Sequence, residues 1–129
     1  MNTKDDSFDI IAAAKNLKAR HEAKKAKKHR LFIQAFKEAQ SIIAMIASKY
    51  APERIYQWGS LLDENHFNEN SDIDIAVQGL TSPQQYFALL GDAMNLSTFP
   101  LDIIELERID PVHKESILLK GKMIYERQQ

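Results

Sequence analysis

Three aspartates in this sequence are spaced so that they could bind divalent cations. Asp72 and Asp74 stand two positions apart in a segment where polar and apolar residues alternate. Both side chains therefore fall on one face of an expected strand, with Cα atoms about 6.5–7 Å apart. Asp102 lies in a later apolar segment, where Leu101 and Ile103 face the opposite way. Carboxylates arranged like this suit two divalent cations held roughly 3.5–4 Å apart around a displacement at phosphorus.

Gly59 and Ser60 end the apolar segment that comes before these aspartates, with eleven residues between Ser60 and Asp72. Glycine lets a backbone approach a phosphate closely, and serine adds a hydroxyl donor. Since every metal ligand would be an oxygen, the sequence favours Mg²⁺ or Mn²⁺ over zinc.

An Asp-x-Asp pair is also compatible with two solvated carboxylates on an edge strand. Two like charges on one half-buried face repel each other, however, so this strand would be unfavourable without a cation. The apolar residues Ile73, Ile75 and Val77 fix the register, so that the carboxylates cannot rotate away. We therefore favour a metal site.

The elements that must position these residues follow from the hydrophobic periodicity and from the prolines and glycines that end each segment. Strands are expected at 54–58, 72–77, 101–106 and 123–125, and a polar loop at 61–71. Helices are expected from 31 to Pro52, from Pro83 and over 111–119. The expected buried faces of the first two helices are Phe32, Phe36, Ala39, Ile43 and Ile46, and then Tyr86, Phe87, Leu89, Leu90, Ala93 and Met94.

The overall composition is that of one globular domain of 129 residues, with no cysteine for a disulfide or a thiolate metal site. No apolar run reaches the ~20 residues of a membrane helix, so we expect a cytoplasmic protein without membrane contact. Residues 1–50 hold 11 Lys and Arg against 5 Asp and Glu, whereas residues 51–129 hold 6 against 13. Residues 9–30 are rich in Ala and Lys and have almost no apolar stripe, which predicts an exposed or partner-dependent helix.

The runs Trp58-Gly59-Ser60, Ser71 to Val77 and Leu101 to Ile104 together resemble the minimal nucleotidyltransferases of the DNA-polymerase-β superfamily, over roughly residues 54–125. The resemblance implies a small α/β fold with a mixed sheet and helices packed on it. We divide the chain into a basic helical N-terminal extension (1–30) and a nucleotidyltransferase domain (31–129).

The same resemblance implies Mg²⁺-dependent (or Mn²⁺-dependent) transfer of a nucleotide from a nucleoside triphosphate such as ATP, with pyrophosphate leaving. Asp72, Asp74 and Asp102 would be the catalytic residues and the metal ligands, with Asp102 a ligand or the base for the acceptor hydroxyl. Gly59 and Ser60 would hold the triphosphate. One departure from the family pattern is that Leu61, Leu62, Asp63 and Glu64 follow Gly59-Ser60, where Arg and Gly are frequent.

Many members of this superfamily are antitoxins that silence a HEPN-domain ribonuclease toxin by adenylylating a tyrosine. We therefore expect AMP transfer to a hydroxyl of such a partner protein. Two alternatives stay open: an antitoxin that acts by contact alone, and a transferase for a small-molecule acceptor. Nucleic-acid binding through residues 15–30 is a further, less favoured reading.

The histidines of the sequence carry weaker signals. His21, His29, His66 and His113 are scattered, which argues against zinc. Arg108 and His113 have the spacing of the HEPN ribonuclease motif, but Pro111 interrupts the helix that this motif requires. His66 could reach a phosphate, although an exposed loop position is favoured.

Overall fold

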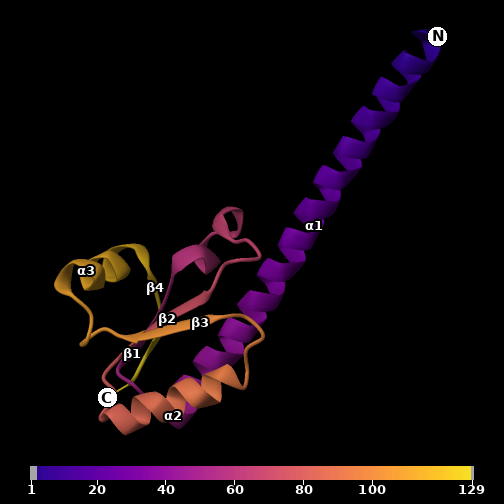
Figure 1. The fold of residues 1–129 in the computed structure, drawn as a ribbon. Coiled ribbons are helices and arrows are strands. Elements are labelled where there is room, and N and C mark those ends of the chain that lie inside the picture. Colours follow the sequence, from indigo (N-terminus) through magenta and orange to yellow (C-terminus); the bar gives the residue numbers. More distant parts are fainter. Residues whose placement is uncertain (1–2, 129) are drawn as a thin grey trace.

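The structure is a computed structural model that describes residues 3–128, with side chains described from Asp9 onward. One long helix precedes a four-stranded sheet that carries two further helices (Figure 1). The elements are α1 (Thr3–Lys49), β1 (Arg54–Trp58), β2 (Ile73–Gln78), α2 (Pro83–Met94), β3 (Leu101–Glu105), α3 (Pro111–Lys120) and β4 (Lys122–Glu126). The expected helical N-terminal extension and mixed sheet are both confirmed. None of the described helices is long and apolar enough to span a bilayer.

The strand order in the sheet is β3-β2-β1-β4. β1 pairs antiparallel with β2 and with β4, whereas β2 and β3 run parallel. α2 makes the crossover between the two parallel strands, as such a connection requires. It begins at Pro83, where the Ser82 side chain accepts a hydrogen bond from the backbone N–H of Gln85.

Helices cover the two faces of the sheet unequally. On one face, α1 and α2 pack through Ala35, Ala39, Ile42, Ile43, Ile46, Leu89 and Ala93 against Ile55, Ile73, Ile75, Val77 and Ile103. On the other face a smaller cluster surrounds Ile117 of α3 and contains Tyr56, Ala76 and Leu106. The carboxylates are therefore on the less covered face, because Asp74 and Asp102 alternate with the isoleucines that face α1.

Several expected details are wrong. Phe87 and Met94 are 68% and 62% exposed, because α2 packs on the core through a narrow stripe of Leu89 and Ala93, with Leu90 at its margin. Phe36 is also exposed. The loop after β1 is not uniformly polar: it forms two 3₁₀ turns, η1 (Gly59–Leu62) and η2 (Glu64–His66), anchored by Leu61 and Phe67, which are 2% and 0% exposed.

Candidate active site

Asp74 and Asp102 lie directly opposite each other on neighbouring strands. They are Cα partners in the parallel register of β2 and β3. Adjacent strands are about 4.8 Å apart, so two side chains at the same level of one face are immediate neighbours. The structure thus brings together two of the three carboxylates that the sequence singles out.

Trp58 lies at the end of β1, beside Asp74, and is its antiparallel Cα partner. It packs with the cluster on the α3 face of the sheet. Its indole ring meets the imidazole of His113 edge-on, with ring centroids 5.4 Å apart, and its Nε1 is buried without a hydrogen-bond partner within the described chain. The aromatic pair forms one wall beside the carboxylates.

Gly59 follows Trp58 and turns the chain away from the sheet. Its φ of +79° lies in the region that favours glycine. A side chain on Gly59 would collide with the Asp74 carboxylate, because an ideal Cβ would stand 2.8 Å from Cγ of Asp74. The Gly-Ser turn and the Asp-x-Asp strand therefore meet at one point, the contact between Gly59 and the Asp74 side chain.

The electrostatics of this point are unusual for an aspartate. Burial, and after it the negative charges of Asp102 and Asp72, together raise the pKa of Asp74 to about 7. A cation bound nearby would strongly stabilise the ionised form of a carboxylate in this position. The all-oxygen donor set together with this crowding of negative charge fits a divalent ion such as Mg²⁺ or Mn²⁺.

Asp72 lies just outside β2, which begins at Ile73 rather than at residue 72 as expected. It is close enough to Asp74 to act on its pKa. Across the described residues, no three His, Asp or Glu side chains already stand in metal-ligating geometry. The metal-binding roles of Asp72, Asp74 and Asp102 therefore remain predictions, as do the triphosphate contacts of Gly59 and Ser60.

Sequence reasoning missed one residue that holds the site. Tyr86 of α2, expected only as a core residue, donates a hydrogen bond of 2.7 Å to the backbone carbonyl of Ile103. β3 is an edge strand, with a neighbouring strand on one side only. The hydrogen bond from Tyr86 therefore fixes the backbone of β3 next to Asp102. Burial and the nearby charges of Glu105 and Asp102 raise the pKa of Tyr86, so its hydroxyl stays protonated as the donor.

The weaker sequence signals resolve simply. His66 is exposed and pairs with Asp63 at 2.7 Å, in agreement with the favoured loop reading. Arg108 lies before α3, where it pairs with Glu105 at 2.8 Å, so it shares no helix with His113.

Comparisons with known proteins agree with this geometry. Residues 40–129 match the family described as "Polymerase beta, Nucleotidyltransferase". A comparison with curated protein sequences gave no match.

Three solved structures are similar to this chain in fold. A chain of the toxin–antitoxin MntA–HepT structure has a TM-score of 0.53 and 22% identity, covering 71% of this chain and 73% of that chain. A chain of a toxin–antitoxin with AMP-PNP has a TM-score of 0.55 and 24% identity, covering 69% and 74%. A chain of the complex between the tri-AMPylated HEPN toxin of Shewanella oneidensis and its MNT antitoxin has a TM-score of 0.53 and 20% identity, covering 74% and 75%. With the family match spanning most of the sequence, this chain belongs to the polymerase-β nucleotidyltransferase family.

Proposed function

We propose that this chain is a metal-dependent adenylyltransferase that moves AMP from ATP to a hydroxyl of a partner protein. The partner would be a HEPN-type toxin, for which this chain is the antitoxin. The observation that carries the proposal is the pairing of Asp74 with Asp102 beside the Gly59 turn. The similar structures include a toxin–antitoxin with AMP-PNP and a tri-AMPylated HEPN toxin, which supports both the nucleotide and the class of acceptor.

In the proposed reaction, the residues of this chain position the reactants and balance charge. Asp72, Asp74 and Asp102 would hold Mg²⁺ or Mn²⁺, which would neutralise charge on the α-phosphate and on the pyrophosphate. The acceptor oxygen bonds to the α-phosphorus while Asp102 accepts the hydroxyl proton. The bond from that phosphorus to the bridging oxygen breaks, and pyrophosphate leaves with the electron pair. Gly59 gives the triphosphate access to the backbone, and Ser60 donates its hydroxyl.

A protein acceptor suits the architecture better than a small molecule. The described residues build one sheet, and the face with Asp74 and Asp102 is covered only in part by α3. A small acceptor would need a second lobe to enclose it. A protein acceptor brings its own surface, which completes the site and excludes water.

The test is to co-express the chain with the product of the neighbouring gene and to weigh that protein by intact mass spectrometry. We expect one or more added AMP groups, lost in Asp74→Asn and retained in Glu115→Gln, a matched amide substitution at an exposed position of α3. An unmodified neighbour that is still inhibited would support the contact-only antitoxin. An unmodified and unbound neighbour would support the small-molecule transferase.

A further inference from the structure

The N-terminal part of α1 extends beyond the body of the protein (Figure 1). We call residues 9–30 the arm. Every residue from 9 to 27 is exposed, and the apolar side chains of Ile10, Ile11 and Leu17 are 70%, 58% and 65% exposed. Helices in proteins gain most of their stability from packing an apolar face. Three large apolar side chains on a projecting helix therefore indicate a surface that a partner covers.

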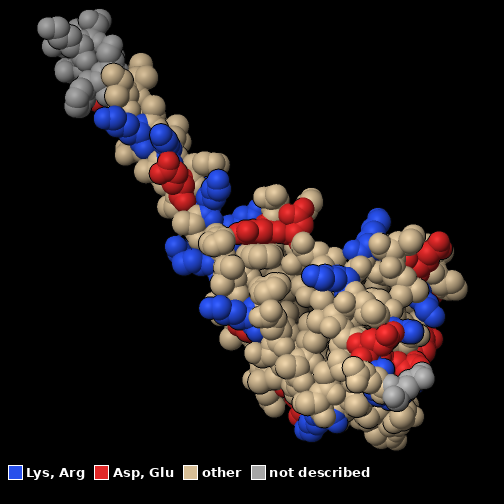
Figure 2. All heavy atoms as spheres, turned by 180° about the vertical axis from the view of Figure 1, so that it is seen from behind, with Lys and Arg blue, Asp and Glu red and all other residues tan. Residues whose placement is uncertain are grey.

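The arm is also strongly basic. It holds eight Lys and Arg residues and only two acidic ones, Asp9 and Glu22. Figure 2 shows Lys and Arg side chains along the projecting helix. A partner surface with complementary charge would therefore be acidic.

The base of the arm is attached to the segment that follows the Gly-Ser turn. Lys28 donates from Nζ to the backbone carbonyl of Asn65 at 2.9 Å, and His29 contacts the Glu64 carboxylate. Lys27 lies 3.9 Å from Glu69. These contacts join the arm to the end of the sheet where β1 finishes and β2 starts. A protein that brings a hydroxyl to Asp74 and Asp102 therefore comes within reach of the arm.

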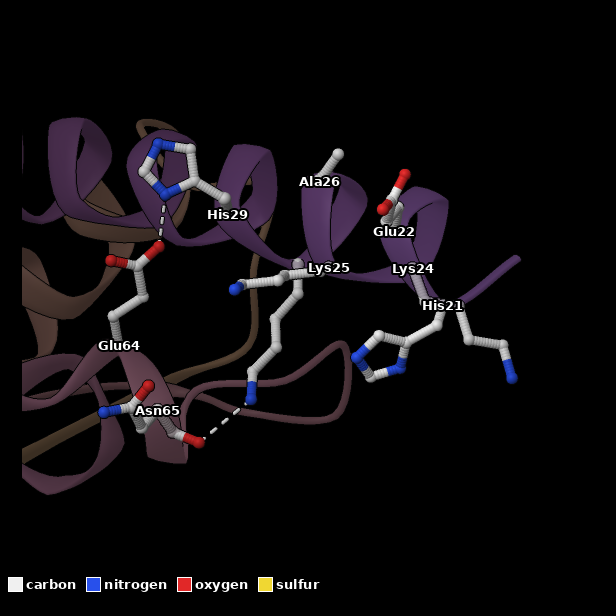
Figure 3. Close-up of a pocket in the computed structure, with 9 residues that line it drawn as sticks. His21, Glu22, Lys24, Lys25, Ala26, His29, Glu64 and Asn65 are labelled. Carbon is white, nitrogen blue, oxygen red and sulfur yellow. Dashed lines mark hydrogen bonds and ion pairs between the residues drawn. The ribbon is translucent and has the colours of Figure 1, made fainter. Parts of the chain in front are cut away.

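A groove of about 920 Å³ lies where the arm meets η2 (Figure 3). Its lining residues include His21, Lys24, Lys25 and Lys28 of the arm, and Glu64 on the opposite side. Lys28 is already engaged with Asn65, but among the described residues no ion pair occupies Lys24 or Lys25. These two ammonium groups are available for carboxylates of a partner.

The composition of the arm favours a protein over RNA as the occupant. Residues 9–30 contain no Phe, Tyr or Trp, the large aromatic side chains on which the bases of single-stranded RNA stack most extensively. Ile10, Ile11 and Leu17 would bury apolar area on a protein but not on a phosphate backbone. Glu22 and Glu64, which also line the groove, would repel phosphates.

We propose that the arm docks on an acidic, partly apolar surface of the protein that supplies the acceptor hydroxyl. The identity of that protein rests on the proposed function, whereas the charge and the apolar residues of the arm do not. Docking there increases the rate of encounter and holds the acceptor near the carboxylates, without taking part in the chemical step.

The test measures binding of the full chain to the neighbouring gene product by surface plasmon resonance between 50 and 300 mM salt. The Asp74→Asn background prevents transfer during this measurement. Lys24→Glu/Lys25→Glu is expected to weaken binding at least tenfold at low salt and to flatten its salt dependence. Lys37→Glu/Lys120→Glu, a charge-matched control at exposed positions outside the arm, is expected to change binding less than threefold. In the active chain, the arm variant should raise KM for the acceptor and leave kcat unchanged.

The outcomes separate this inference from the proposed function. Arm-dependent binding without AMP transfer would support the docking surface and refute the transferase. Transfer with unchanged KM in the arm variant would support the transferase and overturn the docking surface. Two further results would overturn the docking surface. The first is arm-dependent binding of fluorescent single-stranded RNA with no binding of the neighbouring gene product. The second is salt-sensitive self-association in sedimentation, again with no binding of the neighbouring gene product. Self-association has to be measured because residues 51–129 are acidic.

Discussion

The backbone of Gly59 packs directly against the carboxylate of Asp74. An ideal Cβ at Gly59 would stand 2.8 Å from Cγ of Asp74 and closer still to Oδ2. The same glycine has a φ of +79°, which a residue with a side chain adopts only at a cost. One position therefore joins the Gly-Ser turn to the Asp-x-Asp strand and leaves room only for a hydrogen atom.

Substitution of Gly59 by Ala is expected to displace the Asp74 side chain. Misplacement by about 1 Å can reduce a reaction rate about 100-fold, so we expect AMP transfer to fall by at least that factor. Strain at positive φ should also reduce the free energy of unfolding by about 1–3 kcal/mol. Single-turnover kinetics and urea denaturation measure the two effects.

Gly91→Ala is the matched control. Gly91 lies inside α2, and an ideal Cβ there has no heavy atom within 4 Å. Because alanine favours helix more than glycine does, the free energy of unfolding should rise by about 0.5–1 kcal/mol with transfer unchanged. Full transfer activity in Gly59→Ala would contradict the role given to the turn.

The stability of the metal-free protein should depend on pH through Asp74. Burial and the charges of Asp102 and Asp72 raise its pKa to about 7, whereas the unfolded chain titrates near its ordinary value of about 3.9. The folded state therefore binds a proton more tightly than the unfolded state. This contribution to stability is fully present below about pH 4 and is lost as the pH rises to about 7.

Denaturation in EDTA between pH 5 and pH 8 would measure this dependence, and Asp74→Asn is expected to flatten it. Mg²⁺ added at pH 8 should stabilise the original chain and have little effect on the variant, because the cation offsets the crowded carboxylates. Equal stabilisation of both chains by Mg²⁺ would argue against a metal site at Asp74.

Tyr86→Phe should reduce the rate of transfer as well as stability. The substitution removes the hydrogen bond to the Ile103 carbonyl and frees the edge strand beside Asp102. One such bond contributes about 1 kcal/mol, which corresponds to roughly a fivefold fall in kcat if the strand is held in the reacting geometry. Tyr125→Phe on β4 is the control, since the Tyr125 hydroxyl makes no hydrogen bond within the described chain. Unchanged kcat in Tyr86→Phe would show that the bond is dispensable.

The face of β2 on which Asp74 lies was predictable, because the alternation from Asp72 to Val77 leaves one arrangement in which the isoleucines are buried. The direct pairing of Asp74 with Asp102 was not predictable, since the parallel register depends on how α2 crosses between the strands. Tyr86 was missed for a related reason: its partner is a backbone carbonyl 17 residues away, and no local pattern marks such a bond.

The buried side of α2 was predicted too widely. Successive residues of a helix are rotated by about 100°, so Phe87 and Met94 form one stripe of α2, and Leu89 and Ala93 lie roughly 130° away around the helix axis. A 12-residue helix at the edge of a small sheet has room to bury only one stripe, so the second stays exposed. In the loop after β1, Leu61 and Phe67 belong to the hydrophobic core. Their burial was not predicted, because most of their neighbours in the sequence are polar and the two residues form no periodic pattern.

Removal of residues 1–26 is expected to leave the body intact. Residues 9–26, the part of that segment whose side chains the structure describes, are exposed throughout, whereas the contacts to the 64–69 loop begin at Lys27. The free energy of unfolding should therefore stay within about 1 kcal/mol of the full chain, with a single cooperative calorimetric transition.

A truncation that starts at residue 31 also removes Lys28 and His29, so hydrogen exchange in residues 59–72 should become faster in that variant alone. Loss of cooperative melting in the shorter truncation would mean that the arm packs on the body in solution, and the docking surface would then be an internal one.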